Sequence, residues 1–179
     1  MEHKGLIPNE SYEIFIIGDN ITNYLHFPHI LDHTCGNMYC YDSYTFPTLH
    51  FTVWVEDGRI DTICCDQVCY WKNTNLIGMP YSDFLIMCGQ KPTKESKEYV
   101  LLSKDRGQNQ KVYIFDDLSL TIWTWRNKIK TVLMYKNEDE EELYLSEKPV
   151  NGNGILDTKK IDRIRKDAHD KNNGETHWN

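Results

Sequence analysis

The sequence predicts an α+β fold, built on a twisted and mainly antiparallel sheet with a few helices packed on one face. Two observations lead to this fold class. Short segments rich in strand-forming residues are separated by short polar turns, and only two stretches carry the boundary signals of a helix. The chain has 179 residues, of which 40% are hydrophobic and 12% aromatic. A chain of this length buries enough surface to fold without a metal or a disulfide framework.

The clearest pair of strands flanks a tight turn. Every second residue of the segment 49–56 is apolar, which is the alternation of a half-buried strand. Asp57-Gly58 follows, and glycine adopts the positive φ of a tight turn at no steric cost. The next segment, 59–65, again has strand composition. We therefore expect an antiparallel hairpin.

Three further strands are expected at residues 111–115, 120–125 and 129–135. The gaps between them are short and polar, containing Asp116-Asp117 and Arg126-Asn127-Lys128. Short gaps of this kind favour a meander of adjacent antiparallel strands.

Two helices are expected. Residues 81–88 follow Pro80 and precede Gly89, which is the usual asymmetry of helix boundaries. A shorter helix is expected after Asp19-Asn20, since either side chain can cap a helix start, and Pro28 ends it.

The charge and the content of large apolar residues change near Tyr135. The whole chain has 27 acidic and 20 basic residues and a net charge of −7. Residues 1–135 carry a net charge of −4 and four of the five tryptophans, whereas residues 136–179 carry −3 and few large apolar groups. We expect a single globular domain over 1–135, followed by a flexible acidic tail over 136–179. The tail starts with the acidic run 138–142 and has the pattern of a weakly docked helix at 157–171, followed by a disordered end at 172–179.

The sequence favours a protein of the cytoplasm. No apolar run approaches the roughly 20 residues needed to cross a bilayer, and the N-terminus lacks an apolar signal segment, so no membrane association is expected. The six cysteines lack a regular framework and are expected to be reduced thiols. The glycines at 18, 78 and 107 are isolated, so no phosphate-binding loop and no cofactor are expected.

Histidines and cysteines leave open a small metal- or cysteine-dependent enzyme. His26, His29 and His33 recur at helical spacing with Cys35 close behind, as zinc ligands can, but Pro28 interrupts the helix that this spacing needs. Cys64, Cys65 and Cys69 lack the Cys-x-x-Cys spacing, and packing thiols explain them more simply. A cysteine paired in space with a histidine stays open as a nucleophile.

A single-stranded nucleic-acid-binding domain is the second alternative. Trp123 and Trp125 share one strand face, and Arg126, Lys128 and Lys130 follow them. Bases stack on indoles and phosphates pair with cations, so this pattern suits single strands. The acidity of the domain disfavours direct binding of nucleic acid and favours a central strand covered on both faces, with a basic turn at its end.

Five short segments occur in a characteristic succession along the chain. They are Gly18-Asp19-Asn20-Ile21, Tyr41-Asp42-Ser43-Tyr44, Cys69-Tyr70-Trp71-Lys72, Asn75-Leu76-Ile77-Gly78-Met79 and Trp123-Thr124-Trp125-Arg126. Together they resemble small bacterial immunity proteins, in particular those that accompany contact-dependent growth-inhibition toxins. The resemblance spans residues 11–135 and leaves the tail unmatched.

This resemblance implies a cytoplasmic α+β protein, not an enzyme, that binds a cognate toxin domain and blocks its active site. Such toxins are often nucleases with basic clefts, and an acidic inhibitor is electrostatically suited to them. We expect the contacts to come from acidic and amide-rich loops, with the run 138–142 steering association. The expected toxin-binding residues are Asp57, Asp61, Asp66, Gln108, Asn109, Asp116 and Asp117.

Overall fold

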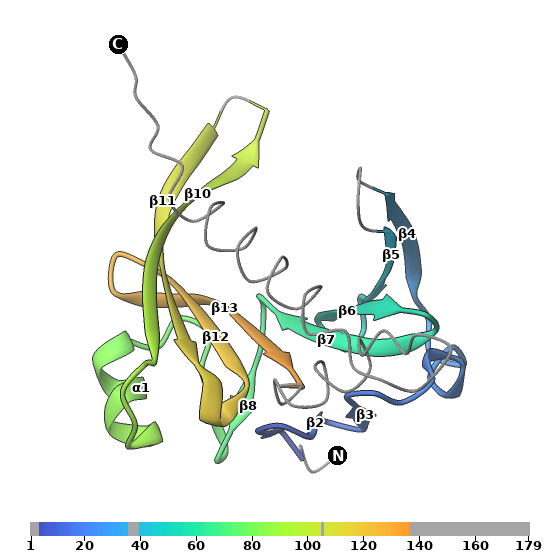
Figure 1. Cartoon of the computed structure of the whole chain (residues 1–179), viewed down its shortest axis with the longest axis horizontal. Helices are drawn as coiled ribbons and strands as arrows, with labels where there is room; N and C mark the ends of the chain where they lie inside the picture. Colours follow the sequence, from blue (N-terminus) through green and yellow to red (C-terminus); the bar gives the residue numbers. More distant parts are fainter. Residues whose placement is uncertain (1–3, 36–39, 105, 137–179) are drawn as a thin grey trace, which may run out of the picture. The chain divides into compact units, whose positions relative to one another are not determined.

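An eight-stranded antiparallel sheet dominates the computed structural model, which describes residues 4–35, 40–104 and 106–136 (Figure 1). Each strand hydrogen-bonds to its neighbours in the order β10-β11-β12-β13-β7-β6-β5-β4. In that order the strands are β10 (Lys94–Ser103), β11 (Arg106–Phe115), β12 (Leu120–Trp125), β13 (Lys128–Tyr135), β7 (Arg59–Cys65), β6 (Phe51–Glu56), β5 (Cys40–Phe46) and β4 (Ile30–Cys35).

Smaller elements accompany the sheet. The N-terminal segment forms a three-stranded sheet, and a two-stranded ladder precedes the single α-helix of the described residues. Their bounds are β1 (Leu6–Ile7), β2 (Ser11–Tyr12), β3 (Phe15–Ile16), β8 (Tyr70–Trp71), β9 (Thr74–Asn75) and α1 (Tyr81–Cys88), with two 3-10 turns, η1 (Ile21–Asn23) and η2 (Asp116–Leu118).

The predicted antiparallel sheet, hairpin and meander are confirmed. β6 and β7 pair across the Asp57-Gly58 turn, and β11, β12 and β13 are consecutive neighbours. The sequence overestimates the number of helices, because the described residues contain one α-helix beside the two 3-10 turns. The fold is therefore more strongly dominated by its sheet than the sequence predicts.

Both expected helical segments contain helical structure, but only α1 begins and ends at the predicted signals. α1 begins after Pro80 and ends at Gly89, whose φ of +71° closes the helix in the left-handed region. The expected helix after Asp19-Asn20 is only the 3-10 turn η1, where the Asn20 side chain accepts a hydrogen bond from the Thr22 amide at 2.9 Å. The turn ends at Asn23, five residues before Pro28, so the prediction that Pro28 ends this helix is wrong.

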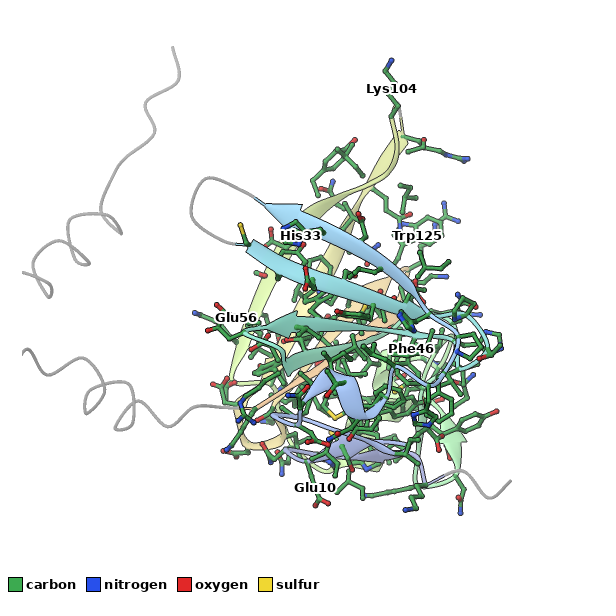
Figure 2. All side chains as sticks on the ribbon, turned by 90° about the vertical axis from the view of Figure 1, so that its right-hand side faces the viewer. Glu10, His33, Phe46, Glu56, Lys104 and Trp125 are labelled. Carbon is green, nitrogen blue, oxygen red and sulfur yellow. The ribbon has the colours of Figure 1, made fainter. Side chains whose placement is uncertain are left out.

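Three strands of the eight-stranded sheet escape sequence analysis, as do the five short strands outside it, and one predicted loop is wrong. β4, β5 and β10 carry no regular apolar alternation. β4 and β10 are the exposed edges of the sheet, and in β5 only Tyr44 and Phe46 are buried. The segment Arg106-Gly107-Gln108-Asn109-Gln110, expected as an amide-rich loop, is the first half of β11 and pairs with β10. Lys104 marks the far tip of this projecting hairpin in Figure 2.

The N-terminal segment covers one face of the sheet and forms the centre of the core. The Phe15 ring lies 4.3 Å from Tyr24, 4.8 Å from Phe46 and 4.9 Å from Phe51, measured between ring centroids. Phe15 and Phe46 are fully buried. Burial of side chains of this size contributes about 1.5–3 kcal/mol each, so Phe15 holds the N-terminal segment against β5 and β6.

Helix α1 covers the β11 half of the same face. The Tyr81 ring stacks on Tyr113 with centroids 3.8 Å apart, and Phe84 meets Phe115 edge to face at 5.4 Å. Phe84 is fully buried. The helix and the N-terminal segment therefore lie on the same side of the sheet.

The predicted acidic tail, 136–179, lies outside the described residues apart from Lys136. Strand β13 ends at Tyr135, where the sequence predicts the globular domain to end. Over the described residues, we find no helix with the length and apolarity that a membrane crossing requires.

Alanine at Gly5 is expected to destabilise the fold more than alanine at Gly18. Both glycines have positive φ, +67° and +84°, but a Cβ on Gly5 would lie 2.7 Å from the Tyr70 carbonyl oxygen, whereas a Cβ on Gly18 meets nothing within 4 Å. The left-handed conformation alone costs an alanine about 1–2 kcal/mol. Urea denaturation should show that loss for Gly18→Ala and roughly 1–3 kcal/mol more for Gly5→Ala. Equal losses would show that the Tyr70 carbonyl moves aside freely.

The stability of the N-terminal segment is expected to depend on ionisation of Asp19. Its carboxylate accepts hydrogen bonds from the Tyr24 hydroxyl at 2.7 Å, the Asn23 amide group at 3.0 Å and the Asn20 amide at 2.8 Å, and these hold the pKa of Asp19 below its usual range. A lowered pKa stabilises the fold above the unfolded value of about 3.9, and the gain is lost as the pH falls through the folded pKa.

The variant Asp19→Asn should therefore be less stable than the parent at pH 6, and the difference should shrink as the pH falls below about 4. Thermal denaturation over pH 2.5–7 measures this dependence. Asp57→Asn is the matched control, because no described residue donates a hydrogen bond to the Asp57 carboxylate and the residue is exposed. A pH-independent difference for Asp19→Asn would contradict the role of the carboxylate.

Candidate binding site on the open sheet face

The second face of the sheet is open within the described residues. The described elements that cover the sheet pack on the first face, so the side chains that alternate with that core point the other way. We call this second surface the open face. Its central residues are Thr52, Trp54, Thr62, Cys64, Thr121, Trp123, Trp125, Thr131, Leu133 and Tyr135.

Aromatic side chains on the open face are only partly buried. Trp54, Trp123 and Trp125 are all of intermediate exposure, in contrast to the fully buried Phe46 and Phe51 positions on the first face. Among the described residues, the buried Nε1 of Trp123 has no hydrogen-bond acceptor. Half-exposed indoles and an unpartnered donor are typical of a surface that receives another molecule.

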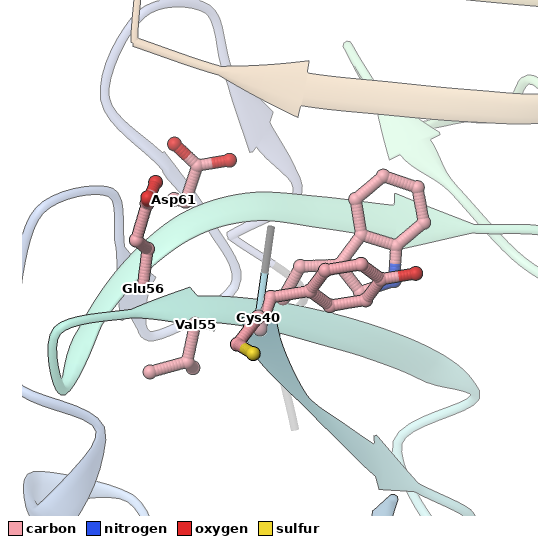
Figure 3. Close-up of a pocket in the computed structure, with 6 residues that line it drawn as sticks. Cys40, Val55, Glu56 and Asp61 are labelled. Carbon is pink, nitrogen blue, oxygen red and sulfur yellow. The ribbon is translucent and has the colours of Figure 1, made fainter. Parts of the chain in front are cut away.

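A pocket lies at the β5–β6–β7 part of this face, with a volume of about 240 Å³ (Figure 3). Tyr41 and Trp54 form an aromatic pair there, with ring centroids 5.9 Å apart and an angle of 46° between their planes. Two carboxylates, from Glu56 and Asp61, complete the polar lining. The full lining is Cys40, Tyr41, Trp54, Val55, Glu56 and Asp61.

A β-bulge brings Asp61 into this pocket. Val55 pairs with Ile60, but the preceding residue Trp54 pairs with Thr62, so Asp61 is an extra residue in β7. A bulge of this kind re-aims the side chain of its extra residue. Figure 3 shows the Asp61 and Glu56 carboxylates on one side of the hairpin, while Val55 points the opposite way.

A second bulge lies in β13 and carries a positive charge. Trp123 pairs with Thr131 and Thr124 with Ile129, which leaves Lys130 as the extra residue. The Lys130 Nζ lies 5.6 Å from the Trp125 ring centroid, and the Arg126 guanidinium lies 4.3 Å from it. The open face therefore has an acidic aromatic group at one bulge and a basic aromatic group at the other.

The structure gathers four of the seven predicted contact residues at one end of the sheet. Asp57 and Asp61 lie at the β6–β7 turn, and Asp116 and Asp117 lie in η2 between β11 and β12. Only β13 separates β7 from β12 in the sheet, and Met134 pairs with both Ile63 and Leu120, so the β6–β7 turn and η2 lie toward the same end of the strands. We call these residues, together with Glu56, the acidic end.

The other three predicted contact residues lie at the opposite end. Asp66 follows the end of β7, and Gln108 and Asn109 lie near the start of β11. The expectation that all seven occupy loops is wrong for Asp61, Gln108 and Asn109, which belong to strands. Glu56 and Tyr41 were not predicted, since nothing in the sequence shows that their strands meet beside a bulge.

The histidines do not form a metal-binding cluster among the residues that the structure describes. No group of three or more His, Cys, Asp or Glu side chains suited to a metal occurs among residues 4–34, 40–104 and 106–136. His29 Nδ1 is bonded to the Phe27 carbonyl at 2.9 Å, and His33 is bonded to the Asp42 carboxylate. His26 packs against the Phe27 ring. The histidines do not form the helical face that their spacing suggests, because η1 ends before His26.

Burial governs the chemistry of the neighbouring thiols. It raises the pKa of Cys64 to about 12, and a hydrogen bond with Cys69 together with burial raises that of Cys65. Cys64, Cys65, Cys69 and Cys88 are free. Cys40 is disulfide-bonded, which corrects the expectation that all six cysteines are reduced.

The rate of alkylation measures how reactive these thiols are. A thiol with a raised pKa is almost fully protonated at pH 7.5, and only the thiolate reacts. Iodoacetamide should therefore modify Cys64 at least about 100-fold more slowly in the folded protein than in urea, as followed by peptide mass spectrometry. Partly exposed Cys88 is the internal reference. Faster modification of Cys64 than of Cys88 would instead indicate an activated nucleophile.

Comparison with protein-family models, with curated proteins and with solved structures finds no match to this chain.

Proposed function

We propose that the protein is a non-enzymatic immunity protein of the cytoplasm, which binds a cognate toxin domain and blocks its active site. The toxin domain is a basic nuclease, and the contact surface is the acidic end together with the adjoining open face. The observation that carries this proposal is the placement of the Glu56 and Asp61 carboxylates beside the half-exposed Trp54, with Asp57 and Asp117 in turns at the same end of the strands.

This combination suits a protein partner. Aromatic side chains are enriched at the centres of interfaces, where they exclude water, and charged groups at the margin raise the association rate. Trp54 supplies the aromatic centre close to Glu56 and Asp61. The rest of the acidic end lies at neighbouring turns of the sheet.

The charge of the acidic end fits a cleft that binds phosphates. A nuclease cleft presents cations to the nucleic-acid backbone, and carboxylates can take the positions of the phosphates. Strand β13 ends at Tyr135, and the run Glu138-Asp139-Glu140-Glu141-Glu142 begins three residues later in the chain. These five acidic residues therefore follow β13 closely in the sequence, and β13 finishes at the acidic end of the sheet.

Binding of single-stranded nucleic acid is a second candidate, supported by the basic aromatic group. Trp125 has Arg126 and Lys130 over its ring, and cations beside an indole also suit a stacked base. Quenching of tryptophan fluorescence by single-stranded RNA at 20 mM salt tests this candidate. Quenching that weakens steeply with salt would support it, and an unchanged signal would exclude it.

The proposed function is tested by mixing the purified protein with the toxin-like product of the adjacent gene. A stable complex and loss of nuclease activity are expected. The variant Asp57→Asn/Asp117→Asn should lower the association rate constant several-fold at low salt and have little effect at 0.5 M salt, because long-range attraction is screened.

The double variant Asp83→Asn/Glu98→Gln removes the same two charges away from the acidic end and is the matched control. Its association rate should stay close to that of the parent. Equal slowing by both variants would show that net charge matters and the acidic end does not. Absence of both a complex and inhibition would overturn the proposed function.

A further inference from the structure

We propose that the pocket formed by Tyr41, Trp54, Glu56 and Asp61 binds the guanidinium group of an arginine side chain. That the arginine belongs to the toxin domain rests on the proposed function. The pocket has a volume of about 240 Å³ and combines an aromatic wall with two carboxylates. These are the two kinds of group that recognise a guanidinium, through its planar face and through its N–H edge.

The aromatic wall is available to a cation. Two other tryptophans already have cations from this chain over their rings: Lys72 lies 4.8 Å from the Trp71 centroid, and Arg126 lies 4.3 Å from that of Trp125. Among the described residues, no lysine or arginine occupies the corresponding position at Trp54. Tyr41, beside it, is 37% exposed. The indole of Trp54 can therefore receive a cation from outside.

The two carboxylates are also without a cationic partner in the part of the chain that the structure describes. Arg59 is paired in register with Glu56, but its guanidinium donates to the Gly18 carbonyl at 3.0 Å. That bond directs Arg59 toward the N-terminal segment. The pocket consequently carries two negative charges that the described cations do not neutralise.

Asp61 is held in a fixed orientation for binding. The Thr62 hydroxyl donates to its Oδ2 at 2.7 Å, and the bulge keeps the residue out of the regular strand pairing. A fixed carboxylate loses little side-chain entropy when a ligand arrives. Arginine suits this arrangement better than lysine, because its planar group can stack on the indole and donate to a carboxylate at the same time.

The pocket is tested directly with N-acetyl-arginine amide, without the toxin. The Trp54 Nε1–H resonance, assigned by its loss in Trp54→Phe, should shift saturably, with a dissociation constant in the millimolar range. The lysine analogue should bind several-fold more weakly. The neutral citrulline analogue should cause no saturable shift.

The variant Glu56→Gln/Asp61→Asn should weaken arginine binding at least about tenfold, since both charge-assisted contacts are lost. Asp83→Asn/Glu98→Gln removes the same charge outside the pocket and should leave binding within about twofold of the parent. Glu56→Gln alone gives the same direction of change if the double variant does not fold. An unresponsive Trp54 signal, or equal binding of arginine and citrulline analogues, would overturn the proposal.

These outcomes separate the pocket from the proposed function. Arginine binding at Trp54 without any toxin complex would overturn the immunity function and support the pocket. A toxin complex unaffected by Glu56→Gln/Asp61→Asn, with no arginine shift, would overturn the pocket and support the function.

Discussion

Burial of a single face of the sheet is the constraint on which the rest of the structure depends. Phe15 fills the space over β5 and β6, and α1 fills the space over β11 through Phe84. Because side chains alternate along a strand, this burial fixes which residues face outward as firmly as which face inward. A shift of one residue in β6 would bury Trp54 and expose Val53. The open face is thus a consequence of the core on the opposite side.

The bulges in β7 and β13 are local departures from this alternation, and both place a charge beside a tryptophan. The bulge in β7 sets Asp61 beside Trp54, and the bulge in β13 sets Lys130 beside Trp125. A bulge leaves its extra residue unpaired, so it is retained where the altered direction of a side chain matters. At Trp125 the chain supplies its own cations, whereas at Trp54 it supplies carboxylates. The two ends of the open face consequently differ in the charge that they can accept.

The sequence predicts those elements whose apolar alternation or turn chemistry is local. The hairpin around Asp57-Gly58, the β11–β13 meander and α1 follow from such signals. β4 and β10 could not be found this way, because an edge strand with little burial has no apolar period to detect. Acidity alone makes Asp61 a candidate contact residue, but its place in a pocket depends on a bulge and on Tyr41, which comes from another strand. Register and bulges are tertiary properties that local pattern does not contain.

The net charge of −7 has a different meaning once its positions are known. The meander carries Arg126, Lys128 and Lys130 at one end of its strands and Asp116 and Asp117 at the other. Successive turns of an antiparallel meander lie at opposite ends of its strands, so the charges in these turns are separated in space. The electrostatic potential is therefore negative at one end of the surface and positive at the other, although the net charge is modest. A basic partner approaching this field would meet the acidic end first, with Trp54 beside it to exclude water from the charged contacts. Removal of water strengthens a guanidinium–carboxylate contact only when both charged groups are paired. The pocket holds two carboxylates that no described cation neutralises, beside an indole that no described cation covers. These groups therefore favour a cation supplied from outside the chain.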